Sequence, residues 1–261
     1  MPLDTRREHD TQRRFRRCFT VCVVAGALGA TRTASAFRPF DGTDGDVAET
    51  GHFELELGPA HYYRAGSNTS LIEPAAVLNL GILPRFELVC DFKDFVEEEH
   101  FGDSSRASIR GTDLLLKWVA REGELQGKTG LSVAFEGGVL TPEFGGTSGF
   151  GAQLDGIASK HWRALTLHFN EQAALTRDQR LDLFSGLILE GPREWPVRPV
   201  SEVYLERTAT GPVTRSALLG MIWAAAPSLE LDTGLRAARE NQQAVFEFRL
   251  GFTWSIEVWR S

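Results

Sequence analysis

Residues 244–256 read AVFEFRLGFTWSI and alternate between two kinds of side chain over thirteen positions. The large apolar positions are Phe246, Phe248, Leu250, Phe252, Trp254 and Ile256, and the positions between them hold Glu247, Arg249, Gly251, Thr253 and Ser255. A sustained period of two predicts a strand with one apolar and one polar face. The stretch exceeds the roughly five or six residues of a typical strand and reaches the about 9–11 residues of a tilted membrane-spanning strand. It therefore favours lipid on one face and a polar lumen on the other, although an edge strand of a soluble sandwich would alternate in the same way.

The same alternation recurs along the chain with almost no helical periodicity. Strands are predicted at residues 52–64, 70–80, 85–95, 108–121, 128–140, 150–158, 161–173, 180–190, 198–208, 214–225, 228–238 and 244–256. Twelve is the even number expected of a single-chain bacterial barrel, and ten is the alternative because the pattern at 150–158 is the weakest. We predict an all-β fold, a transmembrane antiparallel up-and-down β-barrel.

The linkers between these strands are of two kinds. Short ones are predicted at residues 81–84, 159–160 and 226–228, and longer polar or Gly-rich ones at 95–107, 141–149, 174–179 and 237–243. Short turns at one rim and long loops at the other are typical of outer-membrane barrels. The linkers at 65–69, 121–127 and 191–197 fit this division poorly.

The polar faces of the predicted strands should line the lumen. The candidate lumen-facing residues are Glu54, Glu56, Glu87, Asp91, Lys93, Asp113, Lys117, Glu136, His168, Asn170, Glu202, Glu206, Glu230, Asp232, Arg236, Glu247 and Arg249. Acidic side chains outnumber basic ones in this set, so water or cations should reach the lumen or some carboxyl groups should be protonated. On the last strand we expect Phe248 to face lipid and Gly251 to face the lumen, so that Arg should be tolerated better at Gly251 than at Phe248 unless the lumen is tightly filled.

Residues 1–36 are predicted to be an export signal. Four arginines between residues 13 and 17 precede a short apolar stretch at 18–30, and Ala34-Ser35-Ala36 is a small-residue cleavage site. The whole chain has 28 basic and 35 acidic residues; residues 1–36 hold seven Arg and three acids, which leaves 21 basic against 32 acidic residues, a net charge of −11. An acidic mature chain argues against a nucleic-acid partner.

Residues 37–50 are polar and Gly-rich and are predicted to be a periplasmic lead-in, and residues 51–261 are predicted to form the barrel. The expected location is the outer membrane of the cell, with outer-membrane lipid, lipopolysaccharide and the barrel-assembly machinery as partners. A secreted soluble β-barrel or sandwich that acts as a binding module is the alternative.

Several stretches resemble one family of outer-membrane proteins. They are Arg38-Pro39-Phe40 with Asp44, residues 51–56 (GHFELE), residues 80–88 (LGILPRFEL), residues 167–170 (LHFN), residues 202–206 (EVYLE), residues 227–235 (PSLELDTGL) and residues 251–254 (GFTW). The chain thereby resembles the family named for the meta-pathway of phenol degradation, to which a transport role is assigned by inference. The resemblance covers nearly all of the mature chain and implies a barrel of about this size, without indicating a substrate.

No pattern in the sequence predicts catalysis, a metal site or a cofactor. No histidine of the mature chain has a serine two residues later, and no histidine pair has metal-ligand spacing. The acidic run at 97–103 is interpreted as a solvated loop rather than a Ca²⁺ site. We expect a narrow channel or transporter for small compounds, including aromatic or hydrophobic ones, and no enzymatic activity. The alternative is a plugged barrel with a structural or adhesive role.

Overall fold

The structure is a computed structural model that describes residues 38–97, 108–142, 149–209, 211, 213–240 and 242–260. The predicted signal at 1–36 and most of the acidic run at 97–103 lie outside the described residues. Within the described residues, no helix is long and apolar enough to cross a membrane.

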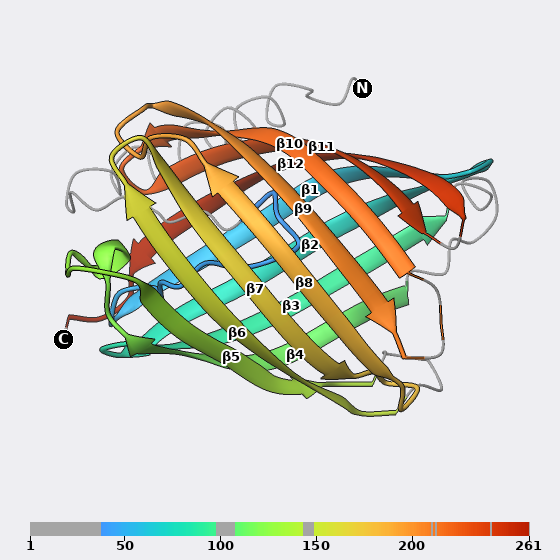
Figure 1. The fold of residues 1–261 in the computed structure, drawn as a ribbon, viewed down its shortest axis with the longest axis horizontal. Coiled ribbons are helices and arrows are strands. Elements are labelled where there is room, and N and C mark those ends of the chain that lie inside the picture. Colours follow the sequence, from blue (N-terminus) through green and yellow to red (C-terminus); the bar gives the residue numbers. More distant parts are fainter. Residues whose placement is uncertain are drawn as a thin grey trace, which may run out of the picture. The chain divides into compact units, whose positions relative to one another are not determined.

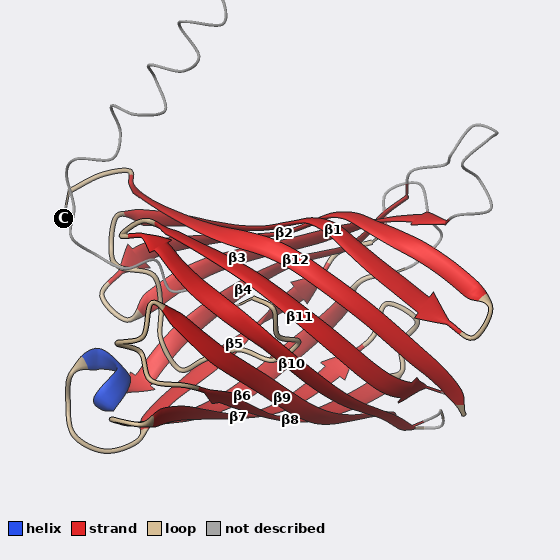
Figure 2. Ribbon diagram, turned by 90° about the horizontal axis from the view of Figure 1, so that it is seen from above, coloured by secondary structure: helices blue, strands red, loops and turns tan. Residues whose placement is uncertain are grey.

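The described residues form twelve strands that close into one barrel (Figures 1 and 2). The strands are β1 (His52–Ala65), β2 (Asn68–Leu83), β3 (Phe86–Glu97), β4 (Ser108–Arg121), β5 (Ser132–Leu140), β6 (Gly151–Trp162), β7 (Leu165–Leu175), β8 (Leu181–Glu190), β9 (Val197–Thr208), β10 (Val213–Ala226), β11 (Leu229–Glu240) and β12 (Gln243–Glu257). Each pairs antiparallel with its neighbours in sequence, and β12 pairs with β1 to close the ring. The prediction of an all-β up-and-down barrel of twelve strands is confirmed.

The alternation in β12 is realised as an inner and an outer wall. Val245, Glu247, Arg249, Gly251 and Thr253 are buried inside the barrel, whereas Phe246, Phe248, Leu250 and Trp254 keep 39–46 % of their surface exposed on the outside. Gly251 does face the interior, but there is no room beside it. A Cβ there would meet the guanidinium of Arg38 and would lie 2.7 Å from Asp232 Oδ2, so the lumen is tightly filled at this position, which is the condition under which Arg would not be tolerated there.

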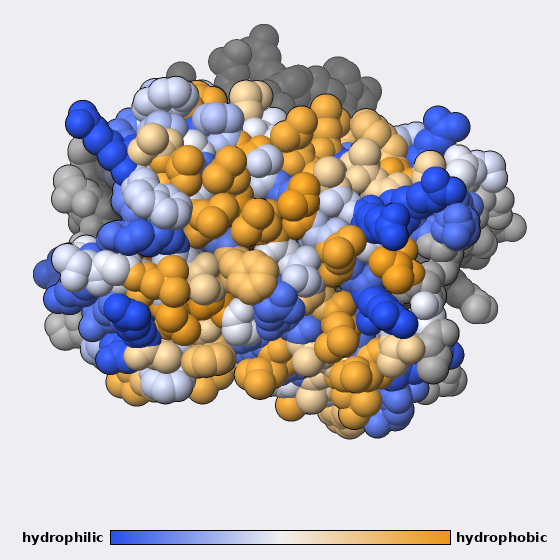
Figure 3. All heavy atoms as spheres, viewed as in Figure 1, coloured by the Kyte–Doolittle hydropathy of each residue, from blue (hydrophilic) through white to orange (hydrophobic). Residues whose placement is uncertain are grey.

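The outer wall is largely apolar in every part of the ring. Exposed apolar side chains on successive strands include Trp118, Phe135, Leu154, Phe169, Leu187, Val203, Leu219, Leu235 and Phe248. On the visible face, hydrophobic residues cover much of the middle and hydrophilic ones gather toward both ends (Figure 3). Glu171 on β7 is an exception, an exposed carboxylate that accepts a hydrogen bond of 2.6 Å from Ser185.

A bulge in β1 changes which positions face inward. The register with β12 shifts between Leu57 and Ala60. Before the shift Glu54 and Glu56 are buried, and after it His61 is buried instead. An extra residue in one strand reverses the parity of all later side chains, so strict period two does not predict the inner face of the whole strand.

The predicted division into short and long linkers holds only in part. The rim that carries His52 and Glu257, called here the terminal rim, has two-residue turns at 84–85, 163–164 and 227–228 but also loops at 122–131 and 191–196. The opposite rim, called the far rim, has the turn at 66–67, the loop at 176–180 and the two-residue linker between β11 and β12. It also carries the ten-residue linkers at 98–107 and 141–150, which were predicted to be long and most of which lie outside the described residues. The expected linkers at 159–160 and 237–243 are wrong, because β6, β11 and β12 each continue into them.

The loop at 122–131 delays the start of β5 by four residues relative to the prediction at 128. It contains the one-turn 3-10 helix η2 (Glu124–Gln126), and Gly127 and Gly130 adopt φ of +70° and +92°. Positive φ is incompatible with an extended strand, and glycine adopts it without steric cost. The two glycines therefore end the alternating pattern locally.

Residues 38–48 lie inside the barrel and are called here the plug segment (Figure 1, blue). Phe40 packs against Val200 and Ile222 of β9 and β10, and Val47 packs against a buried cluster on β4 to β6. The prediction of a periplasmic lead-in at 37–50 is thus wrong for the plug segment. Its polar, Gly-rich composition suits a polar lumen as well as it suits solvent, and composition alone did not distinguish the two.

Candidate functional site: a plugged acidic lumen

The structure brings the predicted lumen residues together inside the barrel. Those that are buried there are Glu54, Glu56, Glu87, Lys117, Glu136, His168, Asn170, Glu202, Glu230, Asp232, Arg236, Glu247 and Arg249. Asp91, Asp113 and Glu206 are half-buried and line an internal cavity. The side chain of Lys93, on β3, lies outside the described residues.

Sequence reasoning missed other buried charges of the interior. Arg38, Asp44, Asp155, Glu190 and Arg198 are all buried. Arg38 and Asp44 belong to the plug segment and were assigned to the periplasm. Glu190 and Arg198 continue the inward parity of β8 and β9 at their ends, so extending the alternation to the strand ends would have found them. Asp155 lies on the strand whose pattern was the weakest.

Arg236 on β11 and Arg249 on β12, called here the basic cluster, bind the first part of the plug segment. The Arg249 guanidinium donates to both carboxylate oxygens of Asp41, at 2.9 and 3.0 Å, and to the Pro39 carbonyl at 2.6 Å. It also contacts Glu247 at 2.9 Å, and Arg236 contacts the same carboxylate at 3.1 Å. Charge-assisted hydrogen bonds such as these are about twice as strong as those between neutral groups.

The Glu202 carboxylate on β9 accepts hydrogen bonds from the next two backbone N–H groups of the plug segment. The Asp41 N–H lies 2.9 Å from one carboxylate oxygen, and the Gly42 N–H lies 2.7 Å from the other. A Cβ at Gly42 would be only 3.1 Å from that carboxylate. The close approach of backbone to carboxylate therefore favours glycine at this position.

The second part of the plug segment is bound by β4, β6 and β7. Asn170 exchanges two hydrogen bonds with the Thr43 backbone, at 2.7 and 2.8 Å, and Ser159 accepts the Gly45 N–H at 2.9 Å. The Lys117 ammonium donates to Asp44 at 3.1 Å. Burial by itself would raise the pKa of the Asp44 carboxyl, but the attraction of Lys117, followed by that of His168, lowers it to about 2. Asp44 is therefore ionised at neutral pH, and its bond to Lys117 is lost only when the pH falls through that lowered pKa.

A chain of buried polar groups lies beneath the plug segment, at the terminal rim. Ser159 Oγ is 2.8 Å from His168 Nδ1, His168 Nε2 is 3.0 Å from Glu190, and Glu190 in turn accepts from Arg198 Nε at 3.1 Å. Arg198 completes the chain with two bonds to Glu230, at 2.9 and 3.0 Å. Ser159 and His168 face each other on neighbouring strands, so a search for both residues on one strand overlooks the pair.

The residue types of this chain are those of a nucleophile, a base and an orienting carboxylate. Ser159 and His168 are fully buried, however, and the serine hydroxyl is already bound to the plug segment. Neither residue lines the internal cavity. In this arrangement the Ser159 hydroxyl holds the Gly45 amide.

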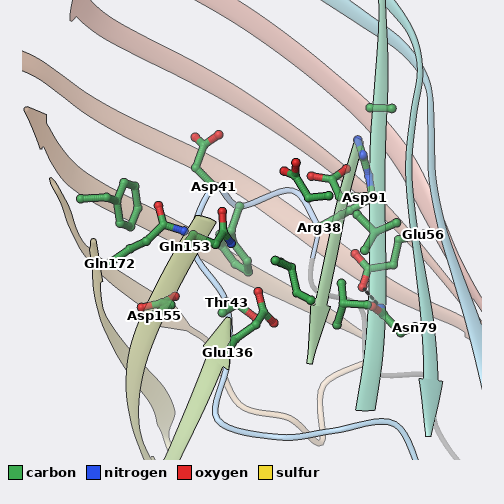
Figure 4. Close-up of a pocket in the computed structure, with 18 of the residues that line it drawn as sticks. Arg38, Asp41, Thr43, Glu56, Asn79, Asp91, Glu136, Gln153, Asp155 and Gln172 are labelled. Carbon is green, nitrogen blue, oxygen red and sulfur yellow. Dashed lines mark hydrogen bonds between the residues drawn. The ribbon is translucent and has the colours of Figure 1, made fainter. Parts of the chain in front are cut away.

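A cavity of about 590 Å³ lies in the lumen beside the plug segment (Figure 4). Its lining includes Asp41, Thr43 and Asp44 of the plug segment and Thr176 and Arg177 of the β7–β8 loop at the far rim. Arg177 joins the far rim by donating to the Thr141 carbonyl at 2.6 Å and to Asp113 at 2.5 Å. Among the described residues, no three His, Cys, Asp or Glu side chains are grouped as metal ligands.

Comparison with solved structures finds similar outer-membrane barrels. The COG4313 outer membrane channel from Pseudomonas putida F1 superposes with a TM-score of 0.63 at 10% identity, covering 83% of this chain and 100% of that chain. The KdgM porin superposes with a TM-score of 0.52 at 11% identity, covering 78% and 99%. At these identities the similarity establishes the fold alone. No protein-family model matches the chain and no curated protein is similar to it, so the resemblance to the meta-pathway family stays a prediction.

Proposed function

We propose that this protein is an outer-membrane channel for small solutes and that the plug segment closes it in the conformation described here. The observation that carries the proposal is a closed barrel whose lumen holds a solute-sized cavity lined in part by an internal segment of the same chain. Ligand cavities are typically about 300–1,000 Å³. The two similar structures are described as a channel and a porin, which supports the same role here.

The outer wall supports a membrane location over the soluble alternative. Soluble monomers rarely expose contiguous apolar patches of more than a few hundred Å², whereas exposed Leu, Phe and Trp side chains occur around this ring. The exposed aromatics Trp118, Trp162, Trp223 and Trp254 are suited to the membrane interface. Outer-membrane lipid, lipopolysaccharide and the assembly machinery remain the expected partners.

The lipid-facing assignment is tested at Phe248. We expect Phe248→Arg to lower the free energy of unfolding in lipid by about 2–4 kcal/mol, because it places a cation on the outer wall near the middle of the bilayer. Phe248→Leu is the matched control and should change it little. Denaturant titration of protein refolded in vesicles measures both variants, and equal stabilities of the two would show that this face does not contact lipid.

Channel function is tested by planar-bilayer recording of the purified protein. The acidic lining predicts currents carried preferentially by cations, and a reversal potential under a KCl gradient reports the sign. Anion selectivity would contradict the role assigned to the acidic wall. A barrel that conducts neither as purified nor after removal of the plug segment would instead favour the structural or adhesive role, which the dense bonding of the plug segment also suits.

We propose a pore rather than an enzyme. The support for this is the enclosure of Ser159 and His168 beneath the plug segment, where the serine hydroxyl is bound to Gly45. No cofactor enters the proposed function.

A further inference from the structure

The internal cavity has far more acidic than basic side chains, and its bases are already engaged. Thirteen carboxyl and five basic side chains are among its described lining residues. The ion pairs of those bases are Arg38–Asp232 at 3.6 Å, Lys117–Asp44 at 3.1 Å, Arg177–Asp113 at 2.5 Å, Arg236–Glu247 at 3.1 Å and Arg249–Asp41 at 2.9 Å. The cavity lining therefore carries a net negative charge, which a cation that enters the cavity would reduce.

Two of these carboxylates face each other directly across the β5–β6 pair. Glu136 and Asp155 are register partners, and Glu136 has Lys117 as its partner on the other side. Like charges directly opposite on neighbouring strands are destabilising unless something lies between them. Both side chains line the cavity, and Figure 4 shows them projecting into it from adjacent strands.

Asp155 gives an independent indication of a ligand. Its residue is only 4 % exposed, yet its Oδ1 accepts no hydrogen bond from any described residue. A buried, unsatisfied carboxylate oxygen costs free energy that a donor from a ligand would recover. The atom is therefore the natural partner of a cationic N–H group.

The residues around Asp155 indicate which chemical groups the rest of a ligand would contact. Gln172 is its register partner on β7, and the partner of Gln172 on β8 is Phe184. All three line the cavity, together with the buried apolar side chains of Leu115 and Ala174. Passing around the barrel from strand to strand, the side-chain amide of Gln172 therefore comes next after Asp155, and the aromatic ring of Phe184 comes after Gln172.

The geometry points to a binding site for a small organic cation, with its ammonium group between Glu136 and Asp155 and its apolar body against Phe184 and Leu115. A bare metal ion would leave the apolar part of the lining unused, whereas an amine on an apolar body matches both parts. The inference rests on the proposed function for its physiological meaning, since the cation would be the solute that enters the channel.

Isothermal titration of the purified full-length barrel in detergent at neutral pH tests the site. The probes are benzylammonium, its neutral analogue benzyl alcohol, benzoate and Ca²⁺ alone. We expect benzylammonium to bind and the other three to bind at least about tenfold more weakly, the effect of losing one charge-assisted hydrogen bond. Equal binding of benzyl alcohol, or preferential binding of Ca²⁺ or benzoate, would overturn the inference.

Two carboxylate-to-amide variants locate the site. Asp155→Asn should weaken benzylammonium binding by about tenfold or more. Glu171→Gln is the matched control, because Glu171 lies next to Gln172 on β7 but is exposed on the outer wall, and it should leave binding unchanged. Unchanged affinity in folded Asp155→Asn, or equal losses in the two variants, would refute the assignment. If Asp155→Asn does not fold, the ligand series on the unmodified protein decides by itself.

The same preparation is recorded in planar bilayers, so that the two proposals fail separately. Conductance without benzylammonium binding would refute the cation site and leave the channel in place. Binding without conductance, before and after removal of the plug segment, would refute the channel and leave a barrel that binds organic cations.

Discussion

Deleting residues 38–48 is expected to convert a barrel with little or no conductance into one with discrete, resolved current steps. The plug segment lies across the lumen and is bonded to strands on different sides of it, through Arg249 on β12, Glu202 on β9 and Lys117 on β4. A twelve-stranded ring lies between eight-stranded barrels, which side chains fill, and sixteen-stranded porins, which are open. The plug segment therefore occupies space in the lumen that the strands alone would leave to water. Planar-bilayer recording measures the expected increase in conductance.

A reversible closure provides the control for this deletion. A Cβ at Gly45 would lie 3.2 Å from the Ser159 Cβ, close to the about 3.5–4.5 Å between Cβ atoms of a disulfide. In a Cys90→Ser background, Gly45→Cys with Ser159→Cys should hold the plug segment in place when oxidised. Reduction should then permit opening events that oxidation suppresses. Equal conductance of the deleted, oxidised and unmodified proteins would mean that the plug segment does not control the pore.

Arg249→Met is expected to lower the free energy of unfolding by about 3–5 kcal/mol, the usual cost of removing one partner from a buried ion pair. The guanidinium satisfies Asp41, Glu247 and the Pro39 carbonyl together. Methionine fills a similar volume without any donor, so both carboxylates would lose charged bonds in a poorly solvated interior. Guanidinium-chloride unfolding of the refolded barrel measures the loss.

Arg239→Met on β11 is the matched control. Arg239 is exposed and makes a side-chain bond of 3.1 Å to Gln242, so its replacement should change stability by no more than about 0.5 kcal/mol. Combining Arg249→Met with Asp41→Asn should cost less than the sum of the two single changes, because each single change leaves the charge of the other partner uncompensated and the double change removes both charges. Equal effects at Arg249 and Arg239 would show that the basic cluster does not stabilise the plugged state.

The barrel itself was predictable because its determinants repeat along the sequence. Strand β12 alternates over its whole length, and the inner positions Glu247, Arg249 and Gly251 are buried as period two requires. The same local rule placed Glu87, Lys117 and Glu202 inside. It failed where one residue alters the register, as at the β1 bulge, and where positive-φ glycines interrupt a strand, as at Gly127 and Gly130.

The sequence by itself determined the strands, their two faces and the acidic character of the lumen, because side-chain direction along a strand follows from backbone geometry alone. Only the tertiary structure decided what fills that lumen. The bonds of Asp41 to Arg249 and of Asp44 to Lys117 join residues separated by 208 and 73 positions, and no local pattern relates them. The pairing of Ser159 with His168 and of Glu136 with Asp155 likewise depends on the register of neighbouring strands. That register depends on where each strand ends and on the turn that joins it to the next, which the alternation within a single strand does not specify.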